Sequence, residues 1–139
     1  MILVDTNVVS EAMRLMPEPK VIDWIDSQVI ETLYLSTVSL AELLLGVAAL
    51  PEGRRKHGLA KSLNEQTALL FGERILPFTA EAAHAYAQVV TRTSRIGRPI
   101  GLADAQIAAI ATVRGFTVAT RDTAPFEAAG LRVFNPWTS

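Results

Sequence analysis

The sequence predicts an α/β protein, a three-layer sandwich in which helices cover both faces of a parallel sheet. Short apolar runs with strand character alternate along the chain with longer stretches of helical periodicity, an order typical of parallel sheets. The 139 residues suffice for one domain with a sizeable core, and 50% of them are hydrophobic. There are no cysteines, which excludes disulfides and thiolate zinc sites. We therefore expect a single domain over residues 1–139.

The first half of the chain contains two predicted strands and three predicted helices. The β-branched and apolar run 2–4 suits a strand buried on both faces, and 33–35 is typical of a second strand. Apolar residues at helical spacing follow two prolines and predict a helix over 21–29. Residues 38–50 are rich in Leu, Val and Ala and favour a helix. A basic amphipathic helix lies within 53–72.

The second half contains three more predicted strands and three more helices. A helix begins at Thr79 and continues to about Val90. An alanine-rich helix over 102–114 ends at Gly115, and a short helical turn follows Pro125. The three strands are expected at 75–78, 116–119 and 131–134.

Composition excludes several classes of function. The chain has 13 basic and 14 acidic residues and a net charge of −1, so any binding of nucleic acid must come from local basic patches. The apolar run at 1–4 ends at Asp5 and is too short for a signal peptide. The longest apolar stretch, 38–50, includes Glu42 and falls short of the ~20 residues that span a bilayer. We expect no membrane segment and a cytoplasmic protein.

Four acidic residues occupy positions that the predicted fold brings together. Asp5 directly follows the first strand, and Asp122 lies three residues beyond the last residue of the fourth. Asp104 stands in the first turn of the helix before the fourth strand, and Glu42 stands on the helix after the second. Ligands of open parallel sheets bind beyond the carboxyl ends of the strands. If the first and fourth strands are neighbours, all four carboxylates meet there.

Each acid also has an ordinary structural explanation. Asp104 and Asp122 are suited to cap the starts of helices, and Asp5 is suited to a turn at a strand end. Ser39 to Glu42 has the spacing of a capping box, in which the glutamate only completes the helix start. The joint interpretation is favoured because Glu42 is the sole charge in its apolar run and Asp5 ends a buried strand.

A cluster of carboxylates needs a compensating cation, because like charges raise one another's pKa. Oxygen ligands favour Mg²⁺ or Mn²⁺. A zinc site is not expected, since His57 and His84 are too far apart to form a ligand pair. Aspartyl phosphoryl transfer is disfavoured as well. A haloacid-dehalogenase phosphatase needs a second acid where Asn7 stands, and the acidic pair and late lysine of a receiver domain are missing.

Four motifs in order resemble those of PIN domains, and the resemblance covers the whole chain. They are Met-Ile-Leu-Val-Asp-Thr-Asn at 1–7, Val-Ser-Leu-Ala-Glu-Leu at 38–43, Ala103-Asp104 before the alanine-rich helix, and Thr120-Arg121-Asp122. The segments Ile-Leu-Pro-Phe at 75–78 and Phe-Asn-Pro-Trp at 134–137 further resemble the FitB-like branch of VapC toxins.

The resemblance implies a sheet of order 3-2-1-4-5 and a ribonuclease of a toxin–antitoxin pair. Its divalent-metal site would be formed by Asp5, Glu42, Asp104 and Asp122. We expect Asp5 and Asp104 to bind the metal directly. The other two acids would bind it directly or through water. The Thr6 and Thr120 hydroxyls and the Asn7 amide would orient carboxylates or water. Arg121 stands where many PIN domains have Asn or Ser.

Two basic clusters are candidates for contact with RNA. One is Arg54, Arg55 and Lys56, with Lys61 on the same helix, and the other is Arg92, Arg95 and Arg98. Both also suit plain solvated helix faces, and two residues of the second cluster suit a helix C-terminus.

The helix predicted over 38–50 is apolar around almost its whole circumference, and such a helix must be buried on every side. A domain this small covers only part of it, so we expect the rest to meet a partner. The resemblance implies an antitoxin of the VapB or FitA type and a homodimer. A second interpretation of function follows: the chain acts without catalysis in a complex that binds operator DNA through the antitoxin.

Overall fold

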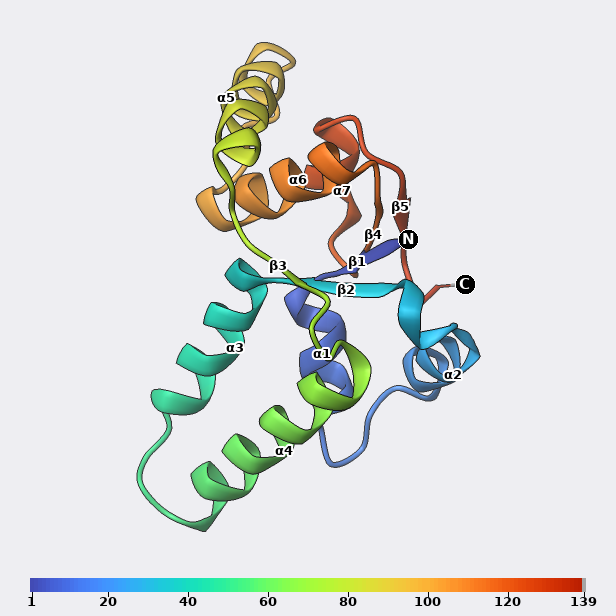
Figure 1. The fold of residues 1–139 in the computed structure, drawn as a ribbon, viewed down its shortest axis with the longest axis vertical. Coiled ribbons are helices and arrows are strands. Elements are labelled where there is room, and N and C mark those ends of the chain that lie inside the picture. The colour runs from blue at the N-terminus through green and yellow to red at the C-terminus, as the bar shows by residue number, and fades with distance from the viewer. Residues whose placement is uncertain (139) are drawn as a thin grey trace.

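Five parallel strands form one sheet in the computed structural model, which describes residues 1–138 (Figure 1). The order β3-β2-β1-β4-β5 is the expected one, and it places the first strand at the centre. The central pairing runs in register from Ile2 opposite Thr117 to Val4 opposite Ala119. The strands are β1 (Ile2–Val4), β2 (Leu33–Ser36), β3 (Ile75–Leu76), β4 (Thr117–Ala119) and β5 (Val133–Phe134).

Helices cover both faces of this sheet, which confirms the predicted three-layer class (Figure 1). One layer holds α1 (Thr6–Ala12), α2 (Pro19–Ser27), α3 (Thr37–Ala48) and α4 (Arg54–Leu70). The opposite layer holds α5 (Ala80–Arg95), α6 (Leu102–Arg114) and α7 (Thr123–Ala128). Successive residues of β1 point to opposite faces, so Leu3 joins the core under α5 and α6 while Val4 joins the core around α1 and α4.

Helix α1 was not predicted from the sequence. It has only seven residues and starts directly after Asp5, whose side chain accepts a hydrogen bond from the Thr6 backbone N–H at 2.8 Å. Asp5 therefore ends β1 and caps α1 at once. Val8 and Val9 on this helix are fully buried, which explains why so short a helix is stable.

Helix α3 corrects one interpretation of Glu42. The helix is capped by Ser36, whose hydroxyl accepts from the Ser39 N–H at 3.0 Å. The capping box suggested by the spacing from Ser39 to Glu42 therefore does not form, because the helix begins one turn earlier. In the isolated chain α3 buries only Ser39 and Leu43 and leaves much of its apolar surface in solvent.

The edge strands are shorter than predicted, because β3 and β5 each pair with only one neighbour over two residues. Helix α7 begins two residues before Pro125 instead of after it, which places the proline in the first turn, where it is tolerated. Within the described residues, no helix has the length and apolar character needed to cross a lipid bilayer.

Candidate active site

The candidate site lies at the carboxyl end of the two central strands. Asp5 follows β1, and Thr120, Arg121 and Asp122 follow β4. The backbone N–H of Asp5 donates to the Ala119 carbonyl at 2.9 Å, which continues the pairing of β1 with β4 to the edge of the site. The topology therefore brings together two acids that are far apart in the sequence.

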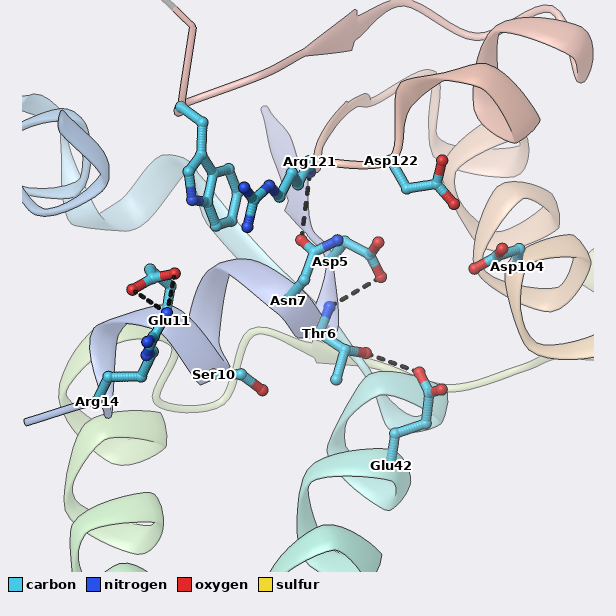
Figure 2. A pocket seen from close by; sticks show the side chains of 11 residues that line it. Asp5, Thr6, Asn7, Ser10, Glu11, Arg14, Glu42, Asp104, Arg121 and Asp122 are labelled. Carbon is cyan, nitrogen blue, oxygen red and sulfur yellow. Dashed lines mark hydrogen bonds and ion pairs between the residues drawn. The ribbon is translucent and has the colours of Figure 1, made fainter. Parts of the chain in front are cut away.

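All four predicted acids line one pocket of about 470 Å³ (Figure 2). Asp5 comes from the junction of β1 and α1, Glu42 from α3, Asp104 from α6 and Asp122 from the segment before α7. Arg121, the departure noted from many PIN domains, lines the same pocket. The remaining lining residues are Thr6, Asn7, Ser10, Glu11, Arg14 and Trp137.

One buried hydroxyl organises the centre of the site. Thr120 is fully buried, and its Oγ1 donates to Asp5 Oδ2 at 2.8 Å. The same oxygen accepts from Asn7 Nδ2 at 3.2 Å and from the Asp122 backbone N–H at 3.1 Å. These bonds fix the Asp5 carboxylate and the backbone of Asp122.

Thr6 links Glu42 to the other acids. Its backbone N–H donates to Asp5 Oδ1, and its Oγ1 donates to Glu42 Oε1 at 2.7 Å (Figure 2). A glutamate on α3 is thereby tied to the start of α1. Both threonines therefore hold carboxylates, as their expected supporting role requires.

Burial and neighbouring negative charge raise the pKa of two of the acids, Asp5 and Asp104. Burial is the largest cause that raises the pKa of Asp5, and Glu42 and Asp122 raise it further, while hydrogen bonds from the two threonines oppose the shift. Burial also raises the pKa of Asp104 to about 6, and the charges of the other three acids add to that rise. The acids therefore form one electrostatically coupled group.

Two of the acids stand at helix starts without capping hydrogen bonds. Asp104 lies in the first turn of α6, whose N-cap is Gly101 and makes no side-chain capping bond. Asp122 occupies the N-cap position of α7, but its side chain makes no capping hydrogen bond. Both positions agree with the capping interpretation, but no capping bond holds either carboxylate.

Three further residues that line the pocket were not predicted, namely Ser10, Glu11 and Arg14. Glu11 is 6% exposed, accepts from the Glu18 backbone N–H at 3.1 Å and pairs with Arg14 at 3.4 Å. Positions 7, 10, 11 and 14 lie on one face of a helix. If a helix over 6–12 had been predicted, this polar face could have been assigned to the site from the sequence. Trp137 was also not predicted as a site residue, because only the folded structure shows that the segment after β5 lines the pocket.

The two basic clusters lie outside this pocket. Arg54 and Arg55 line a neighbouring groove, and Lys56 bonds Glu52 at 2.7 Å. Arg92 Nε donates to the Ala128 carbonyl at 3.1 Å, so this side chain joins α5 to α7. Among the described residues that line the acidic pocket, neither Arg95 nor Arg98 appears.

The donor set fits a hard divalent cation, since it consists of carboxylate, hydroxyl and amide oxygens. Within residues 1–138, no three His, Cys, Asp or Glu side chains converge closely enough to enclose an ion by themselves. Mg²⁺ does not require such a cage, because it commonly keeps several waters and uses one or two carboxylates.

The family model of the PIN domain matches residues 2–131 of this chain. The chain belongs to the PIN-domain family. Two curated PIN-type relatives are each 47% identical over 137 residues. They are the VapC ribonuclease Y4jK of Sinorhizobium fredii, where 99% of this chain and 98% of the relative align, and the toxin FitB of Neisseria gonorrhoeae, where 99% of each aligns.

The PIN fold of this chain also matches a solved structure of FitAB bound to an IR36 DNA fragment. The TM-score is 0.95 at 45% identity, over 100% of this chain and 97% of the matched one. The resemblance to the FitB-like branch of VapC toxins, inferred from segments 75–78 and 134–137, is thereby confirmed.

Proposed function

We propose that this PIN domain is a divalent-metal-dependent endoribonuclease that acts as the toxin of a toxin–antitoxin pair. The observation that carries the proposal is the convergence of Asp5, Glu42, Asp104 and Asp122 on one pocket, where burial and neighbouring negative charge raise the pKa of Asp5 and Asp104. The names of the relatives support the substrate and the role, since one is a VapC ribonuclease and another is a toxin.

The metal would be Mg²⁺ or Mn²⁺. We assign Asp5 and Asp104 as direct ligands, because these two carboxylates have raised pKa values that a bound cation would relieve. Glu42 and Asp122 would act directly or through water. A bound divalent ion supplies charge neutralisation at the phosphoryl oxygens and lowers the pKa of a coordinated water.

The protein itself contributes orientation. The Thr120 hydroxyl holds Asp5 from the sheet side, and Asn7 holds Thr120 in turn. The Thr6 hydroxyl holds Glu42. Carboxylates fixed in this way need little reorganisation when RNA binds, which is how supporting hydrogen bonds strengthen a metal site.

Incubation of the purified protein with total RNA tests this function. We expect cleavage that requires Mg²⁺ or Mn²⁺, disappears in EDTA and is abolished by Asp5→Asn. Added metal should raise the melting temperature of the wild type by mass action and that of Asp5→Asn much less. Equal metal-induced shifts in both proteins would contradict a shared metal site.

The cognate antitoxin, of the VapB or FitA type, has a matching place to bind. An apolar groove of about 830 Å³ runs between the end of α1, α3 and α4, and it is lined by Leu43, Val47 and Leu50 among others. Thr6 and Glu42 line both this groove and the acidic pocket. A partner segment seated in the groove would therefore reach the acids and block RNA.

The exposed face of α3 supports a homodimer. Leu44 and Leu45 are 47% and 69% exposed, and Ala41 and Ala48 are exposed beside them. Apolar side chains gathered on one helix face favour contact with protein. A second copy of the chain is the proposed occupant.

A second candidate function is a regulatory role without catalysis. It is favoured by the likeness to FitAB bound to DNA. With its net charge of −1 and no global basic field, this chain would reach operator DNA only through the antitoxin. A free protein that cuts no RNA in any metal, yet binds its antitoxin tightly, would favour this role.

A further inference from the structure

The pocket has two walls of unlike character. The four carboxylates lie on one side, while Arg121 and Arg14 lie on the other (Figure 2). The Arg121 side chain turns away from the acids and lies over the Trp137 ring, with its guanidinium carbon 5.3 Å from the ring centroid. This distance lies within the range of a cation–π contact.

Several hydrogen bonds hold Arg121 and Trp137 together. The Arg121 backbone N–H donates to Asn7 Oδ1, and Asn135 Nδ2 donates to the Arg121 carbonyl, both at 3.4 Å. Asn135 Oδ1 accepts from the Trp137 N–H at 2.9 Å. One asparagine thus joins the segment after β4 to the segment after β5. The cation–π pair is therefore attached to the same backbone that carries Thr120 and Asp122.

The charge of Arg121 is available to a ligand. Its side chain is exposed, and within residues 1–138 it takes part in no ion pair, whereas Arg14 is paired with Glu11. A guanidinium binds phosphate through a planar fork of N–H groups, and stacking on an aromatic ring preorganises that fork. An unpaired guanidinium opposite a carboxylate cluster suits a polyanion that must approach the acids.

We propose that Arg121 and Trp137 form a nucleotide subsite of the pocket. Arg121 binds the phosphate next to the bond that is cut, and Trp137 is a positioning residue that holds the guanidinium flat. This inference rests on the proposed ribonuclease function. It adds the place in the pocket where the RNA strand binds. RNA is favoured over a protein ligand because the pair shares its pocket with the acids.

Binding of a labelled single-stranded RNA oligonucleotide in EDTA tests this subsite without cleavage. We expect Arg121→Ala to weaken binding about tenfold or more, because it removes a charge-assisted hydrogen bond to the phosphate. The salt dependence of the affinity should fall by about one phosphate contact. Arg121→Lys should keep that salt dependence, since the charge remains, and recover only part of the affinity.

Trp137 offers an independent spectroscopic readout. The chain has two tryptophans, and Trp24→Phe leaves Trp137 as the only indole. RNA should change the emission of Trp137 in this protein, and Arg121→Ala should remove most of that change. Trp137→Ala should raise the KM for RNA cleavage more than it lowers kcat, because it frees the guanidinium without removing it.

Arg114→Ala is the matched control, since it removes an exposed arginine that lies outside the pocket and belongs to neither basic cluster. Wild-type RNA affinity in Arg121→Ala, or an equal loss in Arg114→Ala, would overturn the subsite and leave the nuclease intact. A smaller metal-induced melting shift in Arg121→Ala would also overturn it, because Arg121 would then act through the acids. A wild type that neither binds nor cuts RNA would overturn both proposals. Weaker antitoxin binding with unchanged RNA binding would assign Arg121 to the protein partner instead.

Discussion

Thr120 shows how much of this site depends on one side chain. Its buried hydroxyl contacts Asp5, Asn7 and the backbone of Asp122. Thr120→Val keeps the shape of the side chain and removes all three bonds. We expect a loss of about 1–3 kcal/mol in the free energy of unfolding, because buried polar groups are left without partners. Urea unfolding measures the loss, and Thr120→Ser, which keeps the hydroxyl, should retain most of the stability.

The raised pKa of Asp104 predicts a pH dependence of stability. In the folded protein this carboxyl keeps its proton up to about pH 6, whereas in the unfolded chain it loses it near pH 4. The folded state therefore holds more protons between these values, and the metal-free protein should lose stability as the pH rises from 4 to 6. Thermal melts of the metal-free protein should show this slope, and Asp104→Asn should flatten it.

Metal should reverse that trend, because an ion binds the deprotonated carboxylate. The rise in melting temperature on adding Mg²⁺ should grow between pH 5 and pH 7. A metal-induced shift that is the same at both pH values would exclude Asp104 as a ligand.

Glu42→Gln separates chemistry from folding. Since the capping box does not form, the one hydrogen bond that this side chain makes within residues 1–138 comes from Thr6, and the glutamine oxygen can accept it as well. We expect an almost unchanged melting temperature and a loss of RNA cleavage of about 10–100-fold, the range for disturbed metal sites. Full cleavage by Glu42→Gln would leave the glutamate with a structural role alone.

The four acids were predictable from the sequence because each stands at a definable position relative to a predicted strand or helix. Glu11 and Arg14 were not predictable as site residues. Glu11 lies on α1 and Arg14 lies just beyond it, and a helix of two turns gives too short a periodic pattern to identify. The bond from Arg92 to α7 was not predictable, because a basic residue near a helix end has the same sequence pattern whether it faces solvent or donates to a neighbouring segment.

At the scale of elements, α3 places Glu42, and its start is set by Ser36. Ser36→Ala removes the bond to the Ser39 N–H and should destabilise the protein by about 1 kcal/mol. Cleavage should also fall, because the first turn of α3 orients the helix toward α1. Thr37→Ala is the control, since Thr37 is exposed and caps nothing. Equal stability of the two variants would mean that the cap contributes little.

The alternation of strands and helices predicted the sheet, while the ends of elements were less predictable. Apolar runs at 75–78 and 131–134 suggested full strands, but an edge strand pairs only as far as its single neighbour extends. The start of α3 was also misplaced. Ser36 and Ser39 are both suitable N-caps by residue type. Because β2 ends at Ser36, that serine becomes the N-cap of α3.

At the scale of the whole molecule, the exposed leucines of α3 predict self-association. Leu45→Lys should convert the proposed homodimer into a monomer, because it places a charge in an apolar contact. Light scattering across a range of protein concentrations measures the mass. Leu69→Lys is matched in exposure at 66% on another helix and should leave the dimer intact. A wild type that is monomeric at every concentration would contradict this interface.

The four carboxylates come from positions spread over nearly the whole chain, from Asp5 to Asp122. Strand β1 is made first, yet it lies at the centre of the sheet and gains its second neighbour only when β4 exists. A ribosome releases the chain from its N-terminus, so Asp5 and Glu42 emerge long before Asp104 and Asp122. The four-acid pocket is therefore complete only after Asp122 has left the ribosome, so the proposed ribonuclease activity should appear only as translation ends.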